Sequence, residues 1–589
     1  MTDTSDEIWE PHAPATTARP RPVALPGPAG RLELLVAGSA SVNVLAEGVL
    51  EVTAEAEHAD GDDGTGDVRI EWRTPCVDVT SFWTPEPRGT GWLPAAWSAP
   101  RRTTLSRGAP VAALVGTGDT TVCAFAADRE EALASAGVVE ETGEFRFWVQ
   151  AAGRLTVRID TSGRHFGHSL AELADWWAAD RPVRVPDAAR LPAYSTWYAL
   201  HQNVTPEAVE RQAALGKELG LDTIIVDDGW MTTDRTRGYA HCGDWEPHSL
   251  PDTAAHVARV HDLGVRYLLW YALPFIGKDS AAWDELGRYA LVDAPHLGAV
   301  VADPRHPEVR AHLADRLARA VEEWGTDGLK VDFVDWFGVQ DPPAPGPGAD
   351  CATVDEGLHL LLGEIRRRID AAAPDAMIEH RQPYVSPGLW PYATMVRAVD
   401  CPLGPQENRQ RVVDTRLVAG PLAVHSDMLM WHPAEPVEQI ACHLINVLFG
   451  VPQISVDLAA LSTEQRETLA FWLGVSRAHV DTLQLGALRP ARPDLGYPMV
   501  TAIGDGTAVV ARYAALPVAT GDGAAGAWRT LLVANADADP DVRLVGGRGT
   551  VGATVQDARG RTVGSATVDL DGGVTVEVPR GGLLTLRRV

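Results

Sequence analysis

The chain has few cysteines, and their arrangement suggests neither a disulfide framework nor a metal site. Six cysteines are spread over 589 residues, and none of them stands in a CxxC pair. This spacing is typical of reduced thiols in a cytoplasm. His380, His425 and His432 also lack the spacing of metal ligands. We therefore expect no metal and no cofactor.

Long apolar runs are missing as well. The best candidate, residues 443–461, is interrupted by Asn446, Pro452, Gln453 and Asp457, so it does not have the pattern of a membrane-spanning helix. Residues 1–7 are acidic and polar, whereas a secretory signal begins with basic residues and continues with apolar ones. These absences predict a cytoplasmic protein that has no membrane partner.

Basic residues are outnumbered. The chain has 51 Lys and Arg against 79 Asp and Glu, a formal net charge of -28. An acidic surface repels phosphate backbones and anionic lipids, so nucleic acid is not expected as a partner. The hydrophobic share of 45% and charged share of 22% are ordinary for a globular protein. A chain of this length needs more than one hydrophobic core.

The residue pattern changes twice along the chain, which predicts three domains. Residues 1–25 are rich in Pro, Ala and Thr and are expected to be irregular. Short alternating runs up to about residue 160 are typical of antiparallel strands, and similar runs return after about residue 481. Between them, strand-like runs alternate with helical ones. We predict an N-terminal β-sandwich with linker (1–186), a (β/α)₈ TIM barrel (187–484) and a C-terminal β-sandwich (485–589), an α/β fold overall.

The barrel prediction depends on eight apolar runs in the middle segment. They cover residues 194–200, 223–227, 265–272, 328–333, 376–380, 395–400, 422–425 and 453–456. Thr205 and Pro206 provide a helix start after the first run, and Gly220 provides a helix end. The longest insertion is expected between the third and fourth strands.

Polar and aromatic side chains gather where these strands end, which is where barrel enzymes carry their active sites. The ends carry Trp197, Asp227, Asp228, Trp230, Trp270, Lys330, Asp332, Glu379, Asp400, His425 and Asp457. So many carboxylates on one rim repel each other, which a purely structural scaffold would avoid. For the run 328–333 taken alone, the structural alternative is that its lysine and aspartate pair with each other inside the barrel.

Two carboxylates across a cleft, ringed by further acids and indoles, are what glycoside cleavage requires. We expect Asp332 to attack the anomeric carbon, with Lys330 on the same side of the strand keeping it ionised. Asp400 follows an apolar run, so partial burial could keep it protonated as the acid/base. Retention and inversion differ in the separation of the two carboxyl groups, and the sequence leaves both open.

These residues resemble a known family. The segments 226–230 (VDDGW), 243–245 (GDW), 269–270 (LW), 330–332 (KVD) and 457–458 (DL) are similar to motifs of the melibiase clan. The best resemblance is to glycoside hydrolase family 36, the bacterial retaining α-galactosidases. The order of sandwich, barrel and sandwich is also similar to that family.

The resemblance implies retention through a covalent intermediate, with Asp332 as nucleophile and Asp400 as acid/base. It implies that Asp227 and Asp228 bind the O4 and O6 hydroxyls of a terminal galactose, with Trp270 and Lys330 as further contacts. A small oligosaccharide or glycoside is then the expected partner, and self-association into a homo-oligomer is plausible.

The chain departs from the family around the fifth and sixth strands. Segment 378–383 (IEHRQP) replaces a Cys-containing glycine-rich segment, and 397–402 (RAVDCP) replaces the usual Trp-Thr-Ser-Asp. An arginine here could favour a modified or anionic sugar. We include Arg381, Trp197, Trp230 and His425 among the expected substrate contacts, with His425 as a rim group. The tryptophans at 83, 92 and 97 could form a subsite wall or pack in a core.

Several alternatives stay open. An α-glycosidase acting on another sugar, or a transglycosylase, would use the same two aspartates. A non-catalytic carbohydrate-binding barrel protein belongs to a different class, and a sugar isomerase is conceivable, because barrel folds support many chemistries.

Overall fold

The computed structural model describes residues 20–23, 32–56, 66–86, 91–339, 341–521 and 527–588. Most of the predicted irregular lead-in, residues 1–25, lies outside these ranges. The chain divides into two compact units: the first is 1–182 with 383–389 and 491–496, and the second is 183–382 with 390–490 and 497–589. The boundaries of the three predicted domains stay a prediction.

The first unit is a pair of antiparallel sheets, as the alternating runs predicted. Among its described residues, one sheet has the order β1-β2-β5-β11-β10-β7 and the other β3-β4-β12-β9-β8-β6. The strands are β1 (Arg21–Pro22), β2 (Glu33–Ala37), β3 (Ser39–Ala46), β4 (Val49–Glu55), β5 (Asp67–Pro75), β6 (Val79–Trp83), β7 (Arg101–Thr103), β8 (Val111–Gly116), β9 (Thr120–Ala127), β10 (Ala132–Val139), β11 (Glu144–Ala152) and β12 (Arg154–Asp160). Helix α1 (Phe166–Ala179) follows them.

The core of this unit lies between the two sheets. The Trp72 ring stacks on the Phe147 ring with the two centroids 5.3 Å apart. The Phe125 ring meets Trp72 edge-on, with the centroids 5.1 Å apart. Such pairs add to the burial of apolar area that stabilises a sandwich. Of the three tryptophans that could line a subsite, Trp83 is buried in this unit, whereas Trp92 is 90% exposed and Trp97 50% exposed. Core packing therefore accounts for Trp83 only.

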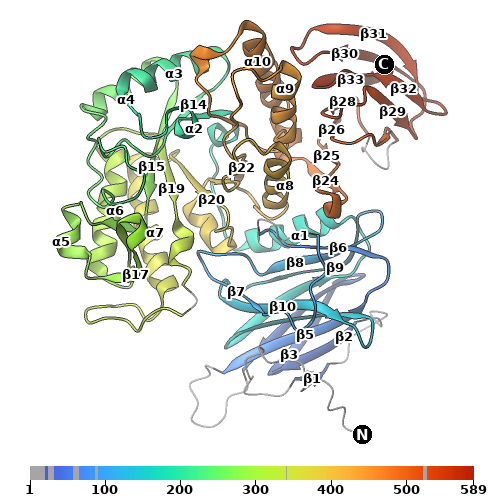
Figure 1. The fold of residues 1–589 in the computed structure, drawn as a ribbon. Helices are drawn as coiled ribbons and strands as arrows, with labels where there is room; N and C mark the ends of the chain where they lie inside the picture. Colours follow the sequence, from blue (N-terminus) through green and yellow to red (C-terminus); the bar gives the residue numbers. More distant parts are fainter. Residues whose placement is uncertain are drawn as a thin grey trace. The chain divides into compact units, whose positions relative to one another are not determined.

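The second unit contains the predicted barrel. Within the described part of residues 193–456, eight strands form a parallel sheet in the order β22-β21-β20-β19-β15-β14-β13-β23 (Figure 1). The strands are β13 (Ala193–Ser195), β14 (Thr223–Val226), β15 (Arg266–Ala272), β19 (Gly328–Asp332), β20 (Met377–Arg381), β21 (Met395–Arg397), β22 (Ala423–His425) and β23 (Gln453–Ile454). Parallel bridges from His425 to Val451 and from Leu429 to Ile454 nearly close the ring. The predicted α/β barrel is confirmed.

Helices connect these strands, and their ends follow the local sequence. They are α2 (Trp197–Leu200), α3 (Pro206–Glu218), α4 (Thr253–Asp262), α5 (Ala282–Leu286), α6 (Pro307–Glu322), α7 (Val354–Ala372), α8 (Pro405–Arg416), α9 (Val437–Asn446) and α10 (Thr463–Ala478). The Thr205 hydroxyl accepts the Ala208 N–H at the start of α3, and Thr353 with Glu356 forms a capping box on α7. Helix α4 packs on β15, and α6 packs on β19 and α7 (Figure 1).

All eight predicted strands occur, and the largest error is in the first. The run 194–200 was expected to be one strand, but β13 ends at Ser195 and residues 197–200 form α2. The insertion between the third and fourth strands is the longest, as predicted. It carries a small antiparallel sheet of β16 (Phe275–Gly277), β17 (Ala290–Ala294) and β18 (Ala299–Ala302).

Strands after the barrel also belong to the second unit. They are β24 (Ala487–Ala491), β25 (Met499–Ile503), β26 (Thr507–Arg512), β27 (Val518–Ala519), β28 (Thr530–Asn535), β29 (Asp541–Val545), β30 (Thr550–Gln556), β31 (Thr562–Asp569), β32 (Val574–Glu577) and β33 (Gly582–Arg588). In the described residues they form a seven-stranded and a three-stranded sheet around a core that includes Trp528. The Tyr513 hydroxyl donates to the Ile445 carbonyl of α9 at 2.9 Å, so this part packs on a barrel helix.

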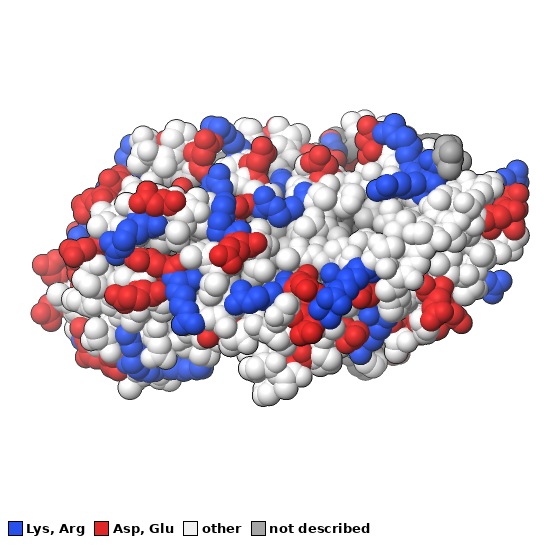
Figure 2. All heavy atoms as spheres, turned by 90° about the horizontal axis from the view of Figure 1, so that it is seen from above, with Lys and Arg blue, Asp and Glu red and all other residues white. Residues whose placement is uncertain are grey.

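No helix in the described ranges is both long and apolar enough to span a membrane. On the face drawn in Figure 2, basic and acidic side chains of the described residues are interspersed. The excess of acidic residues is therefore not gathered into one patch on that face.

Gly328 begins the strand that ends in Asp332, and we predict that Gly328→Ala destabilises the fold. Its φ is +149°, and an added Cβ would lie 1.8 Å from the Met377 carbonyl oxygen of β20. The strand would have to move, so we expect the free energy of unfolding to fall by about 3 kcal/mol or more in urea titrations. Gly325→Ala is the matched control: its φ is +71° with open space around it, and we expect about 1 kcal/mol. Equal losses would contradict the clash.

Candidate active site

Strand register brings the predicted side chains together at one end of the barrel. Trp270 of β15 pairs with Lys330 of β19, which pairs with Glu379 of β20. Two residues further along β20, towards the C-terminal end of the strand, Arg381 pairs with Arg397 of β21. Because side chains two residues apart on a strand leave the same face, Asp332 lies above Lys330 in the same column. The site is therefore a direct result of the parallel pairing.

Asp332 lies at the end of β19, almost buried, and both of its carboxylate oxygens accept hydrogen bonds. Trp270 Nε1 donates to Oδ2 at 3.1 Å, and the Phe333 backbone N–H donates to Oδ1 at 2.9 Å. Arg381 Nε also donates to Oδ1. Burial raises the pKa of Asp332, but the charges of Arg381, Lys330 and Arg397 outweigh it and lower the pKa well below its usual range. Asp332 is therefore ionised.

The expected role of Lys330 is corrected in one respect. Lys330 Nζ lies 2.5 Å from Asp227 Oδ2, so its direct partner is Asp227, two strands away, rather than Asp332 on its own strand. Its charge still acts on the Asp332 carboxylate. Both side chains of this ion pair are buried, and removing one would leave the other charge uncompensated.

Asp228 is buried beside this pair and has a spare oxygen. Gln202 Nε2 donates to Oδ2 at 2.9 Å, whereas Oδ1 has no hydrogen-bond partner. Burial, together with the charge of Asp227, raises the pKa of Asp228 to about 6. The glycine that follows is required by packing, because a Cβ on Gly229, whose φ is +104°, would lie 2.5 Å from the Gln202 Cα. Gln202 was not predicted; only its place after the first strand could have indicated it.

Asp400 differs from the expectation that burial keeps it protonated. It lies three residues beyond the end of β21, its side chain is 50% exposed, and Arg397 Nη2 lies 2.9 Å from its Oδ1. Burial and the charge of Asp332 raise the pKa of Asp400, but Arg397 with Lys330 and Arg381 lowers it below the usual value. Arg381, which contacts Asp332, and Arg397, which contacts Asp400, are paired residues of the neighbouring strands β20 and β21, so the two carboxylates lie at the same end of the barrel.

Arg397 is buried and holds several carboxylates together. Besides Asp400, its Nη1 donates to Asp427 Oδ1 at 2.6 Å, and its Nε lies 3.6 Å from Glu379 Oε1. The Tyr198 hydroxyl donates to Asp427 Oδ2 at 3.1 Å. Burial raises the pKa of Asp427 to about 6 and that of Glu379 to about 7. The sequence placed Glu379 and Asp400 at strand ends but did not identify Arg397 as the common partner of these two acids and Asp427.

The suggestion that an arginine here favours an anionic sugar is not supported. Arg381 is bonded to Asp332, and Arg397 is bonded to Asp400 and Asp427. Each guanidinium is already paired with carboxylate, so neither offers an uncompensated positive charge to a ligand.

Two of the predicted substrate contacts, Trp230 and His425, are buried, whereas Trp197 is partly exposed and stays a prediction. Trp230 is 0% exposed; its Nε1 donates to the Trp270 carbonyl at 2.8 Å, so it supports the site from behind. The rim position expected for His425 is wrong, since its ring is buried between Gln453 and the Ala189 carbonyl, to which Nε2 is 2.7 Å away. Burial lowers the pKa of His425 to about 4. Trp197 keeps part of its ring exposed, with the Arg237 guanidinium 5.9 Å from the ring centroid.

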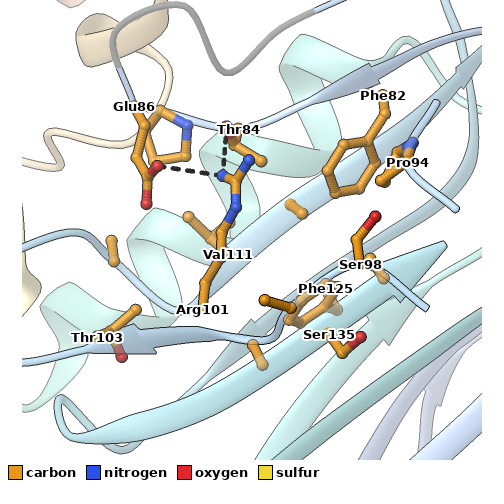
Figure 3. Close-up of a pocket in the computed structure, with 16 residues that line it drawn as sticks. Phe82, Thr84, Glu86, Pro94, Ser98, Arg101, Thr103, Val111, Phe125 and Ser135 are labelled. Atoms are coloured by element: carbon orange, nitrogen blue, oxygen red, sulfur yellow. Dashed lines mark hydrogen bonds and ion pairs between the residues drawn. The ribbon is translucent and has the colours of Figure 1, made fainter. Parts of the chain in front are cut away.

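A cavity in the first unit is a less suitable active site (Figure 3). It has a volume of about 250 Å³ and lies between strands β6, β8 and β9 of one sheet and β7 and β10 of the other. Among the lining residues that the structure describes, Glu86 is the one carboxylate, and it is paired with Arg101 at 3.1 Å. A single paired carboxylate does not supply the two groups that glycoside cleavage needs.

The barrel site has the parts of a two-carboxylate hydrolytic centre. Asp332 is buried and ionised, Asp400 is half exposed, and Asp228 has an oxygen free for a hydroxyl group. No group of His, Cys, Asp and Glu within the described ranges is arranged to hold a metal ion.

Known proteins resemble this chain in part of its sequence. Residues 186–336 match the family model described as Melibiase. The A type blood alpha-D-galactosamine galactosaminidase of Flavonifractor plautii is 25% identical over 299 residues, which cover 45% of this chain and 24% of that protein. Alpha-galactosidase 2 of Pediococcus pentosaceus is 26% identical over 208 residues, covering 33% of this chain and 28% of that protein. The chain thus spans about a quarter of the length of these relatives.

Solved structures extend the likeness to the whole fold. The family 36 alpha-galactosidase AgaA from Geobacillus stearothermophilus has a TM-score of 0.67 at 13% identity, covering 98% of this chain and 88% of that one. A variant of AgaA in complex with raffinose has a TM-score of 0.66 at 14% identity, covering 98% and 86%. At these identities the likeness shows the fold. The predicted resemblance to family 36 is confirmed.

Proposed function

We propose that this chain is a retaining α-glycosidase that removes terminal α-galactosyl groups from small oligosaccharides or glycosides. The observation that carries the proposal is the pair of carboxylates at the ends of β19 and β21. Asp332 is buried and held by Arg381, whereas Asp400 is half exposed and held by Arg397, the residue paired with Arg381 on the next strand. This difference in environment suits a nucleophile and an acid/base.

In the first step, Asp332 attacks the anomeric carbon while Asp400 gives a proton to the glycosidic oxygen. In the second, Asp400 takes a proton from water, which displaces Asp332 with a second inversion and hence net retention. Asp400 is ionised in the free site, because it is paired with Arg397. We propose that a bound sugar ring, by excluding water, raises its pKa to the value that an acid needs.

Binding of the sugar is assigned to the floor of the site. Asp228 Oδ1, which has no partner, accepts a sugar hydroxyl, and the Asp227–Lys330 pair offers a second acceptor and a donor. Trp270 lies behind the nucleophile, with its Nε1 on Asp332. Galactose is proposed because the sequence relatives are named for α-galactosides or α-galactosaminides, and raffinose is the ligand of a structure with this fold.

The test is a panel of aryl glycosides: α-galactoside, α-galactosaminide, α-N-acetylgalactosaminide, β-arabinopyranoside and α-glucoside, with the first anomer of the product followed by NMR. We expect the α-galactoside to be cleaved fastest and α-galactose to appear first. Inversion would contradict the double displacement. Faster cleavage of the α-galactosaminide, favoured by the name of one relative, would move the assignment to an amino sugar.

A further inference from the structure

Arg381, predicted to contact the sugar, is instead held against the carboxylate that we propose as the nucleophile. Its Nε donates to Asp332 Oδ1, and its Nη2 lies 3.8 Å from Asp335 Oδ1. Its guanidinium carbon lies 5.0 Å from the centroid of the Phe333 ring. With 11% of its side chain exposed, Arg381 is fixed from three sides by residues 332–335.

The two oxygens of Asp332 are not equivalent. Oδ1 accepts two donors, Arg381 Nε and the Phe333 N–H, whereas Oδ2 accepts one, Trp270 Nε1. Phe333 has a φ of 66°, an uncommon conformation for an aromatic residue. Since each carboxylate oxygen has two lone pairs, Oδ2 keeps one unused.

We propose that Arg381 is a positioning residue for Asp332, which it orients so that Oδ2 attacks the anomeric carbon. The inference rests on the proposed function and assigns to Arg381 a task other than sugar binding. Arg381 acts through the nucleophile and touches no reacting atom of the sugar.

The charge balance of the two steps gives this arrangement a kinetic consequence. When the Oδ2–C1 bond forms, the C1–O bond to the leaving group breaks and its oxygen takes the proton of Asp400. The carboxylate becomes a neutral ester, and Arg381 loses the nearer of its two counter-charges, while Asp335 remains at 3.8 Å. When water attacks C1, Asp400 takes its proton, the C1–Oδ2 bond breaks, and the carboxylate recovers its charge beside Arg381. Arg381 therefore favours release of the glycosyl group over its capture.

The test compares Arg381→Met with Arg381→Lys on an activated aryl α-galactoside. Without the guanidinium, we expect slower release, so that the glycosyl-enzyme accumulates as a pre-steady-state burst and kcat and KM both fall about tenfold. The acid limb of kcat/KM should move upward by about 1 to 3 pH units, because an opposite charge next to a carboxylate lowers its pKa by that amount. Arg381→Lys keeps the positive charge, so its acid limb should lie close to that of the wild type.

Arg366→Met is the matched control. Arg366 on α7 has 14% of its side chain exposed and pairs with Asp370 at 2.5 Å, so it tests the loss of a comparable ion pair outside the site. It should leave both the acid limb and the burst unchanged. If Arg381 binds the sugar instead, Arg381→Met raises KM and leaves the acid limb in place. That result, or a loss of kcat/KM without any pH shift, overturns the proposal.

A double-mutant cycle of thermal stability distinguishes failure of this inference from failure of the proposed function. If the wild-type protein cleaves no glycoside of the panel, the function fails, but the pairing can still be measured by thermal unfolding of Arg381→Met, Asp332→Asn and the double variant. Arg381→Met leaves a buried charge unpaired and should lower the Tm. Adding Asp332→Asn should then restore part of the loss. Additive losses would overturn the pairing.

Discussion

Replacing Asp332 with asparagine is expected to reduce kcat on α-galactosides by a factor on the order of 10⁴ or more, because the proposed nucleophile is lost. The amide has nearly the shape of the carboxylate and can still accept the hydrogen bond from Trp270, so the fold should persist. Turnover of an aryl α-galactoside and circular dichroism of the purified variant are the measurements.

Asp303→Asn is the matched control for Asp332→Asn. Asp303, between β18 and α6, is likewise buried and pairs with an arginine, Arg305, at 2.7 Å, and we assign it no chemistry. This variant removes one negative charge from a buried ion pair outside the site, so the folded protein should keep most of its kcat. If Asp303→Asn is as inactive as Asp332→Asn, or if Asp332→Asn retains activity above a few per cent, the assignment of the nucleophile is wrong.

Replacing Asp400 with asparagine is expected to separate substrates by their leaving groups. An alkyl or sugar leaving group needs a proton as the bond breaks, so its cleavage should slow by about 10²- to 10⁴-fold. A nitrophenolate leaves without a proton, so the first step on that substrate should be nearly unaffected. The measurement is kcat/KM on raffinose and on a nitrophenyl α-galactoside for the same preparations.

The control for Asp400→Asn is another exposed carboxylate paired with arginine. Glu407 on α8 is 38% exposed and lies 2.5 Å from Arg411, and Glu407→Gln should change both substrates little. Equal losses on raffinose and on the nitrophenyl substrate in Asp400→Asn would contradict the acid/base role. They would indicate instead that Asp400 serves to hold Arg397 in place.

Much of the barrel follows from local sequence, because a strand buried on both faces is a continuous apolar run and a helix start has its own chemistry. Strand β14, Thr223–Val226, and helix α3, with Thr205 and Pro206 at its start, are examples. The end of the first strand was missed because the run from Tyr194 to Leu200 is interrupted only by the small residues Ser195 and Thr196. Hydrophobicity alone does not separate a strand from a helical turn.

Strand β10 of the first unit has no such local signal. Strand β10, Ala132–Val139, consists largely of Ala, Ser and Gly, which have little intrinsic preference for strands. It is a strand because β11 and β7 pair with its two edges. Such pairing joins residues far apart in sequence, so no local pattern indicates it.

The site shows the same division between local and long-range information. That Asp227, Lys330, Asp332 and Asp400 gather at strand ends follows from the sequence pattern. Which of them pair does not, because Lys330 reaches Asp227 across the intervening strand β15. Asp400 is half exposed and lies three residues beyond the end of β21, and the direction of such a short loop depends on tertiary contacts. Its protonation state could not be inferred from the apolar run before it.

The indole of Trp230 has a consequence for how variants of this protein should be interpreted. Trp230 donates to the Trp270 carbonyl, and Trp270 donates to Asp332, so an aromatic side chain fully shielded from solvent is two hydrogen bonds from the proposed reaction centre. Trp245 and Tyr271 pack on Trp230 in turn, with ring centroids at 6.1 and 5.3 Å. Changes in this aromatic group could tilt Trp270 and impair turnover without removing any group that meets the ligand. In random mutagenesis, a substitution that lowers the rate would then lie as readily in the aromatic group behind the reaction centre as in the centre itself.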